Sequence, residues 1–196
     1  MVTSLAWGTV STPVGELSVA CSDAGVTRVS FGSSAETPGP AAGPLEPSAG
    51  PAAASAGPAG AARLVTAALD QLACYFAGQR RSFDLPIDWS AASRGQQQVL
   101  SVLFGTVGYG ETITYGSLAV RAGLGDGGPD LPARAVGTIM GSNPWPLIVP
   151  CHRVVAGSGL GGYSGGTGIE IKRWLLIFEG ALPATLDWDP ARAYGI

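Results

Sequence analysis

The chain of 196 residues is poor in the residues that build metal and disulfide frameworks, with one histidine and three cysteines. Structural zinc sites use closely spaced Cys and His ligands, and no Cys-x-x-Cys pair is present, so an ordinary zinc site is poorly supported. Three widely spaced cysteines, an odd number, argue against a disulfide framework. We therefore expect neither a bound metal nor a disulfide scaffold.

Long apolar runs are also missing. No stretch is long enough to cross a bilayer, and the segment Met1–Val10 is too short and too polar for a signal peptide. We therefore expect a cytoplasmic protein with no membrane segment. A hydrophobic content of 46% excludes a disordered chain, and the length suits one or two small domains with a real core.

Charge is scarce as well, and the net charge of −3 is not typical of a strong nucleic-acid binder. Residues 1–92 carry four basic and seven acidic side chains, whereas residues 93–196 carry seven of each. Any contact with DNA is therefore expected in the second half, with few phosphates and a shallow salt dependence.

The segment Ser33–Ala62 differs in kind from the rest of the chain. Twenty-two of its thirty residues are Ala, Gly or Pro, and Leu45 is its one large apolar side chain. Such a composition buries too little surface to offset the entropy of ordering, which predicts a flexible insertion.

The remaining part of the first half predicts a small α/β domain. Glu16–Cys21 and Val26–Phe31 read as strands joined by a turn. Leu64–Ala77 reads as an amphipathic helix. Its apolar residues recur at helical spacing and are Val65, Leu69, Leu72 and Phe76. Phe83–Trp89 alternates apolar and polar residues, as a strand or an extended linker does. If it is a strand, it is expected at the edge of a sheet, because Pro86 has no N–H to donate.

The second half predicts mostly helices. The expected helices cover residues 93–104, 115–122, 132–141 and 169–178. Ser93 and Thr114 suit N-cap positions, and Gly123–Leu131 is expected to form a loop. Two helices on either side of a loop favour a helix-turn-helix-like arrangement. The last helix is expected to turn Ile169, Trp174, Leu175 and Phe178 toward the core.

Cys151 and His152 are adjacent, and His152 is the single histidine of the chain. A thiol attacks as its thiolate, and an imidazole can take the proton directly or through one water. Adjacent side chains on an extended segment point to opposite faces. Proton transfer through a bridging water is therefore at least as plausible here as direct contact between the thiol and the imidazole. Taken alone, the pair is more typical of a buried cysteine used for packing and an ordinary histidine than of a catalytic site.

Five motifs surround this pair in a fixed order. They are Tyr109–Gly116, Ala133–Gly137, Asn143–Val155, Gly162–Gly166 and Lys172–Gly180. Together they resemble the O6-alkylguanine-DNA alkyltransferases, also called methylated-DNA–protein-cysteine methyltransferases. The resemblance is strong over residues 93–182. It is weaker over the first 90 residues, where Thr12–Leu17 and Tyr75–Gly78 carry it.

The resemblance implies an α/β fold in two domains. Residues 1–92 would form a small ribonuclease-H-like domain, and residues 93–182 a winged-helix (helix-turn-helix) domain that carries the cysteine. Residues 183–196 are expected to be a loose tail. The implied function is DNA repair by a monomer, through irreversible transfer of an alkyl group from guanine O6 in double-stranded DNA to Cys151, once per molecule and without a cofactor. Whether O4-alkylthymine is also repaired stays open.

The resemblance also assigns roles at the reacting centre. Cys151 would be the nucleophile, and His152 the base acting through a water. Glu179 would hold the imidazole in its reactive tautomer. Asn143 would brace the turn that carries the cysteine, and Tyr115 would donate a hydrogen bond to N3 of the guanine.

Further roles concern the DNA. The thiol cannot reach O6 inside a duplex, so the base must be flipped out. Arg134 would take the place of the flipped base. Three small residues would let their helix approach the minor groove, namely Ala133, Ala135 and Gly137. Tyr163 would form a wall of the pocket, and Ser164 would donate to O6.

Two other functions remain open. An alkyltransferase-like protein flips the damaged base and transfers nothing, but such proteins lack the cysteine. A thiol hydrolase would use Cys151 and His152 on an acyl substrate with an oxyanion hole, and would leave the helix pair unexplained.

Overall fold

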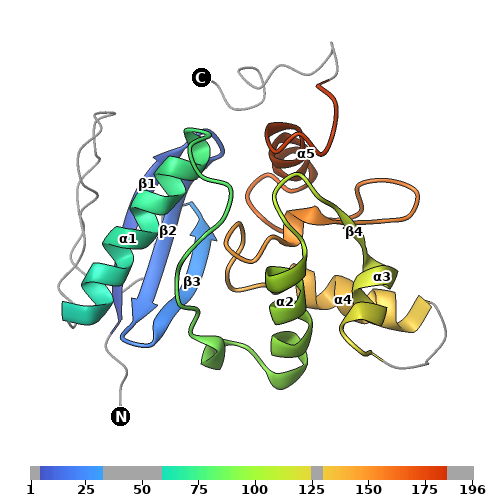
Figure 1. The fold of residues 1–196 in the computed structure, drawn as a ribbon, viewed down its shortest axis with the longest axis horizontal. Coiled ribbons are helices and arrows are strands. Elements are labelled where there is room, and N and C mark those ends of the chain that lie inside the picture. Colours follow the sequence, from blue (N-terminus) through green and yellow to red (C-terminus); the bar gives the residue numbers. More distant parts are fainter. Residues whose placement is uncertain (1–4, 33–58, 125–129, 185–196) are drawn as a thin grey trace. The chain divides into compact units, whose positions relative to one another are not determined.

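The computed structural model describes residues 5–32, 59–124 and 130–184. The chain divides into two compact units, Met1–Ala91 and Ala92–Ile196 (Figure 1). No helix within the described ranges is long and apolar enough to cross a membrane.

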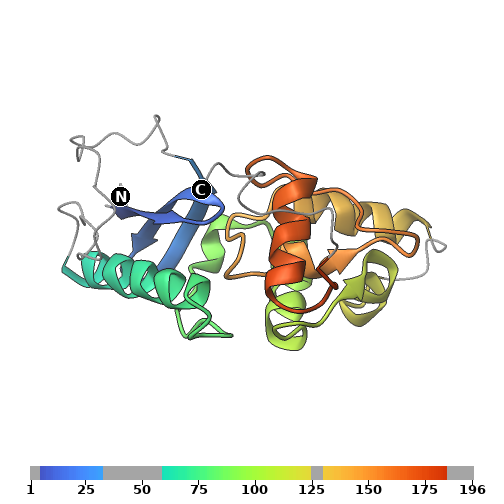
Figure 2. The same cartoon turned by 90° about the horizontal axis from the view of Figure 1, so that it is seen from above.

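The first unit contains a three-stranded antiparallel sheet with one helix packed against it. The strands β1 (Ala6–Thr12), β2 (Gly15–Ser22) and β3 (Gly25–Phe31) lie in the order β1-β2-β3. Helix α1 (Ala59–Phe76) contacts all three strands and lies along one face of the sheet (Figure 2). The expected positions of the second and third strands are confirmed. Strand β1 was not predicted from the sequence, because its apolar alternation is weak.

Helix α1 begins at Ala59, five residues before the predicted start at Leu64, so the C-terminal end of the predicted flexible insertion is helical. The reason is a cap from a distant part of the chain. The backbone N–H of Ala61 donates to Oδ1 of Asp23 at 3.1 Å, which satisfies a donor at the free end of the helix. Residues 33–58 of the predicted insertion lie outside the described residues.

The buried face of α1 differs from the prediction at one position. Its buried side chains are Ala61, Val65, Ala68, Leu69, Leu72 and Tyr75. Phe76 is only half-buried, and Tyr75 occupies the core position instead.

The segment Phe83–Trp89 runs beside β3 as an edge and makes a single parallel bridge, between Val26 and Ile87. The N–H of Val26 donates to the carbonyl of Pro86 at 2.8 Å, and the N–H of Asp88 donates to the carbonyl of Val26 at 3.0 Å. A Cβ on Gly25 would lie 2.5 Å from the Pro86 carbonyl oxygen, so this close approach requires glycine.

The second unit is mainly helical over its described residues. It contains α2 (Arg94–Thr106), β4 (Ile113–Thr114), α3 (Tyr115–Arg121), α4 (Asp130–Gly141), the 3₁₀ helix η2 (Cys151–Arg153), β5 (Val154–Val155) and α5 (Ile169–Phe178). Strands β4 and β5 pair in parallel. Helices α3 and α4 pack against each other, and α2 contacts both, as expected of a helix-turn-helix arrangement (Figure 1).

Local sequence signals explain two of these helix starts. The Ser93 hydroxyl accepts from the N–H of Gln96, and the Gln96 side chain accepts from the N–H of Ser93, which forms a capping box. Oγ1 of Thr114 accepts from the N–H of Ser117 at 3.1 Å. Both predicted N-caps are confirmed.

Two details of the second unit differ from the prediction. Helix α4 begins at Asp130, inside the predicted loop, because Pro132 is tolerated in the first turn of a helix. Helix α5 has the predicted bounds and buries Trp174 and Leu175, but Ile169 and Phe178 are only half-buried. Its other buried residues are Ile171, Lys172 and Leu176.

Candidate active site

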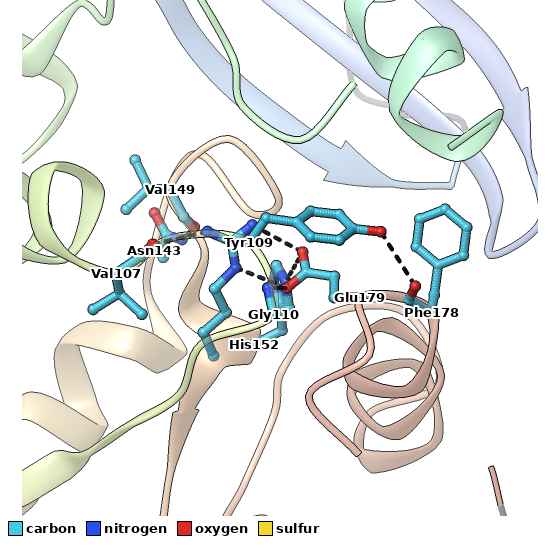
Figure 3. Close-up of polar contacts among 9 residues, drawn as sticks. Val107, Tyr109, Gly110, Asn143, Val149, His152, Phe178 and Glu179 are labelled. Carbon is cyan, nitrogen blue, oxygen red and sulfur yellow. Dashed lines mark hydrogen bonds and ion pairs between the residues drawn. The ribbon is translucent and has the colours of Figure 1, made fainter. Parts of the chain in front are cut away.

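The turn before Cys151 is a buried, tightly bonded segment. Nδ2 of Asn143 donates to the carbonyl of Val149 at 2.9 Å (Figure 3). Oδ1 of Asn143 accepts from the N–H of Trp145 at 3.0 Å. Leu147, inside this turn, has a φ of 72°, which is unusual for a residue with a side chain. The two bonds from Asn143 therefore hold a strained backbone in place.

Cys151 and His152 lie on the 3₁₀ helix η2 and not on the extended segment that was expected. Successive side chains on a 3₁₀ helix point about 120° apart, so the thiol and the imidazole still diverge. In this conformation Cys151 lines a pocket, whereas His152 is fully buried.

His152 and Glu179 form a buried pair. Nε2 of His152 lies 3.0 Å from Oε1 of Glu179 (Figure 3). Arg153 donates to the same carboxylate twice, from Nε at 2.9 Å and from Nη2 at 2.8 Å. The N–H of Gly110 approaches Oε2 at 3.4 Å. Glu179 is therefore a structural and electrostatic centre and not the surface acid that a simpler interpretation of the sequence allows.

Two further bonds fix this cluster to its surroundings. Nη1 of Arg153 donates to the carbonyl of Val107, the residue that caps α2, at 2.8 Å. The Tyr109 hydroxyl donates to the carbonyl of Phe178 at 3.2 Å (Figure 3). The ends of α2 and α5 are thus both tied to η2 or to the loop before β4.

The charges in the cluster follow from burial and pairing. Burial alone would raise the pKa of Glu179, but the bonds and charges of His152 and Arg153 hold that pKa well below its usual range. Burial lowers the pKa of His152 below 6.5, even though Glu179 opposes the shift. The imidazole is therefore neutral at pH 7. When its Nε2–H donates to Glu179, Nδ1 carries the lone pair, and this atom is buried without a hydrogen-bonding partner among the described residues.

Cys151 is a buried thiol with only 4% of its surface exposed. Burial raises its pKa above 9.0, while a hydrogen bond with Asn143, the charge of Lys172 and a hydrogen bond with Tyr163 act in the opposite direction. The resting residue is consequently a protonated thiol, and a base is needed before it can attack.

The thiol opens onto a pocket of about 480 Å³. The pocket is lined by Tyr115, Ala133, Arg134, Gly137, Met140, Gly141, Cys151, Gly162, Tyr163 and Ser164. Helix α4 supplies one wall with a run of mostly small side chains, and the loop that contains Gly162 supplies another. The lining brings together seven of the residues singled out in the sequence.

The other predicted site residues lie outside the lining. His152, Glu179 and Asn143 support the cysteine from behind. Ala135 is exposed on α4 and does not line the pocket. Met140 also lines the pocket and was not predicted, although its spacing of three residues from Gly137 places it on the same face of the helix.

Tyr115 contacts the loop opposite. Its hydroxyl donates to the carbonyl of Gly162 at 3.2 Å, and burial together with the charge of Cys151 raises its pKa. Gly161 has a φ of 70°, and a Cβ there would lie 2.9 Å from the Tyr115 ring, so the loop can approach only as glycine. Nζ of Lys172 also donates to the Gly162 carbonyl, at 3.1 Å.

Among residues 5–32, 59–124 and 130–184, no group of three or more His, Cys, Asp or Glu residues could hold a metal ion.

Two family models match the chain in succession. Residues 5–89 match the ribonuclease-like domain of 6-O-methylguanine DNA methyltransferase, and residues 94–181 match its DNA binding domain.

Individual relatives agree with this result. The chain is 45% identical over 115 residues to a methylated-DNA--protein-cysteine methyltransferase of Mycobacterium tuberculosis, a match that covers 58% of this chain and 64% of that protein. It is 39% identical over 115 residues to a DNA base-flipping protein of Thermus thermophilus, covering 58% of this chain and 71% of that protein. The first of these alignments thus spans slightly less than two thirds of the relative's length.

Solved structures extend the likeness to nearly the whole chain. The crystal structure of Mycobacterium tuberculosis OGT in complex with DNA matches with a TM-score of 0.65 and 35% identity, covering 89% of this chain and 92% of that one. Mycobacterium tuberculosis O6-methylguanine methyltransferase matches with a TM-score of 0.64 and 34% identity, covering 93% of this chain and 97% of that one.

Proposed function

The chain belongs to the 6-O-methylguanine DNA methyltransferase family, and from this premise we propose that it repairs DNA by moving an alkyl group from O6 of guanine to Cys151. The observation that carries the proposal is the position of Cys151, in a pocket walled by α4 and backed by the His152–Glu179 pair. The lesion lies in double-stranded DNA, and the protein acts as a monomer without a cofactor. The free thiols suit the cytoplasm, where cysteines stay reduced.

The thiol is activated by proton transfer. His152 is neutral at pH 7 and its Nδ1 is free to accept, so it takes the Cys151 proton through one water. Glu179 holds the Nε2–H tautomer and stabilises the imidazolium that forms. The thiolate then attacks the alkyl carbon in line with the bond to O6.

The leaving group is the guanine. As the sulfur–carbon bond forms and the carbon–O6 bond breaks, the electron pair passes to the base, which takes up one proton. The thiol has lost one proton, so the overall reaction is balanced. Tyr115 donates to N3 and Ser164 to O6, which stabilises the charge that develops on the base. Tyr163 packs against the flipped base.

Helix α4 enters the minor groove of the DNA. Its side chains Ala133, Ala135 and Gly137 are small, and a narrow groove admits a helix only where such residues face it. Arg134 is exposed at the mouth of the pocket and fills the space that the flipped base leaves in the duplex. The equal numbers of acidic and basic residues after residue 92 favour weak binding to undamaged DNA.

A second candidate function is base flipping without transfer, since one relative bears the name DNA base-flipping protein. Both functions would use the same pocket and the same helix α4. The two differ in the fate of the alkyl group, and the buried thiol in the pocket favours transfer.

Intact-mass analysis after incubation with excess O6-methylguanine duplex tests the proposal. One methyl group should be added per protein molecule, on the peptide that contains Cys151. Cys151→Ala should bind the lesion and transfer nothing. An unmodified protein beside repaired DNA, or sustained turnover, would rule out the mechanism, and lesion binding without transfer by the unaltered protein would favour the flipping function.

A further inference from the structure

Lys172 is a lysine on α5 whose side chain is fully buried and has no part in the relay of His152 and Glu179. Lysine is almost never buried to this degree unless it is paired. Its Nζ donates to the carbonyl of Val154 at 2.6 Å and to the carbonyl of Gly162 at 3.1 Å. The same atom lies 5.7 Å from the centre of the Tyr115 ring.

The two carbonyls belong to two different segments of the chain, each of which supplies residues to the pocket lining or directly follows one that does. Val154 begins β5, directly after the η2 turn that carries Cys151. Gly162 begins the run that supplies Tyr163 and Ser164 to the pocket lining. One ammonium group therefore joins the cysteine-bearing turn to the loop that faces it.

The Gly162 carbonyl has two donors. It accepts from the Tyr115 hydroxyl at 3.2 Å and from Lys172 at 3.1 Å, which its two lone pairs allow. In the proposed reaction the Tyr115 hydroxyl must leave Gly162 in order to donate to the base. Lys172 stays behind, so the carbonyl keeps a partner and the loop keeps its position.

Lys172 also acts on the thiol by its charge. Burial lowers the pKa of Lys172 to about 8, while the negative charge of a Cys151 thiolate raises it. In the other direction, the charge of Lys172 works against the burial that raises the Cys151 pKa. The titratable groups that interact with Lys172 are thus Cys151, His152 and the nearby phenol of Tyr115.

We propose that Lys172 is a positioning residue for alkyl transfer, which frees Tyr115 to serve the flipped base and whose buried positive charge stabilises the Cys151 thiolate as it forms. The inference rests on the proposed function, because the exchange of Tyr115 from Gly162 to the base needs a guanine in the pocket. The stabilisation of the thiolate does not need DNA and can be measured alone.

The test compares charge-removing and charge-keeping variants. Lys172→Met removes the charge at similar length, Lys172→Gln removes it but can still donate to a carbonyl, and Lys172→Arg keeps it. Arg173→Met is the control, since Arg173 is an exposed neighbour on the same helix. The rate at which iodoacetamide labels the Cys151 peptide is followed by mass spectrometry from pH 6 to 10, without DNA, on variants checked for folding by circular dichroism.

Below pH 8, where Lys172 carries its charge in the wild-type protein, the labelling rate should fall about tenfold or more in the neutral variants, the size expected for loss of one nearby charge. Lys172→Arg and Arg173→Met should keep a labelling rate close to that of the wild-type protein. The rate of methyl transfer from duplex DNA near pH 7 should fall about tenfold or more in the neutral variants, in line with the smaller thiolate fraction. In Lys172→Arg the rate of methyl transfer should recover in part, which separates the effect of the charge from the effect of side-chain shape.

A wild-type labelling rate below pH 8 in either folded neutral variant overturns the proposal, even if transfer is slow. Two neutral side chains of different polarity are used so that misfolding of one leaves the other to decide. Failure of the wild-type protein to accept a methyl group from DNA would instead count against the proposed function, and the iodoacetamide curve would still report on Lys172.

Discussion

Nε2 of His152 lies 3.0 Å from Oε1 of Glu179, and neither side chain has any exposure to solvent. The contact leaves Nδ1 as the atom that can accept a proton. Arg153 pairs with the same carboxylate, so Glu179 stays charged in a buried site. Glu179 therefore has two effects. It fixes which nitrogen of His152 can accept a proton, and its pairing with Arg153 stabilises the fold.

Glu179→Gln should therefore impair both stability and transfer. The amide leaves the buried guanidinium of Arg153 without its counter-charge, which typically costs about 3–5 kcal/mol of unfolding free energy. Methyl transfer should slow by roughly 10²-fold or more, because proton transfer by a positioned base contributes at least that much. Urea unfolding and single-turnover kinetics measure the two effects.

Glu170→Gln provides the matched control, because Glu170 is an exposed acid on the same helix. It should change neither quantity appreciably. If Glu179→Gln transfers methyl at the wild-type rate while still folded, the relay assigned to His152 and Glu179 is wrong.

The pH dependence of stability should also reflect this pair. The pKa of His152 in the fold lies below its ordinary value of 6.5, so the unfolded chain binds a proton more readily. Stability from the neutral imidazole is thus complete above pH 6.5 and is lost as pH falls from 6.5 through the lower pKa of the folded state. The depressed pKa of Glu179 adds a further loss below about pH 4.5.

Thermal unfolding midpoints between pH 5 and pH 8 check this expectation. The wild-type midpoint should fall as pH drops below 6.5, and His152→Asn should show a shallower slope over the same interval. Equal slopes in the two proteins would mean that His152 does not bind its proton less tightly in the folded state.

The sequence predicted those parts of the fold that depend on residues close together in the chain. The Ser93–Gln96 capping box and the Thr114 cap are read directly from local spacing. The start of α1 at Ala59 could not be read in this way, because its cap is supplied by Asp23 from 38 residues away.

The candidate site shows the same difference between features that local sequence predicts and features that only the folded chain creates. The Cys151–His152 pair and Glu179 were found because they stand in recognisable motifs. Lys172 stands in one of those motifs too, yet the sequence gave no reason to place its charge in the interior. Its burial depends on the Val154 and Gly162 carbonyls, which only the folded chain brings to it.

Arg134 should matter for duplex DNA and not for the chemistry itself. It is exposed on α4 at the pocket, and its proposed task is to fill the space left by the flipped base. Arg134→Ala should weaken binding to a duplex that carries O6-methylguanine, while the reaction with free O6-methylguanine base stays near the wild-type rate.

The control for this variant is Arg173→Ala, which removes an equal charge from an exposed position on α5. Fluorescence anisotropy with labelled duplex and mass analysis with the free base give the two readouts. Equal losses on duplex and free base in Arg134→Ala would contradict insertion into the duplex.

Asn143→Ala should destabilise the turn that carries the nucleophile. The side chain of Asn143 donates to the Val149 carbonyl and accepts from the Trp145 N–H, and both Trp145 and Val149 are fully buried. Removing it leaves a backbone donor and a backbone acceptor unpaired, at about 1–3 kcal/mol each. The positive φ of Leu147 would then lack the contacts that hold it. We expect a loss of about 2–6 kcal/mol in urea unfolding, and a Cys151 that reacts more slowly because its hydrogen bond with Asn143 no longer favours the thiolate. Ser142→Ala removes hydrogen bonds of the exposed neighbour with Gln96 and Thr138, and it should cost less than Asn143→Ala because water can replace these bonds. If Asn143→Ala matches Ser142→Ala in both measurements, Asn143 does not brace the turn.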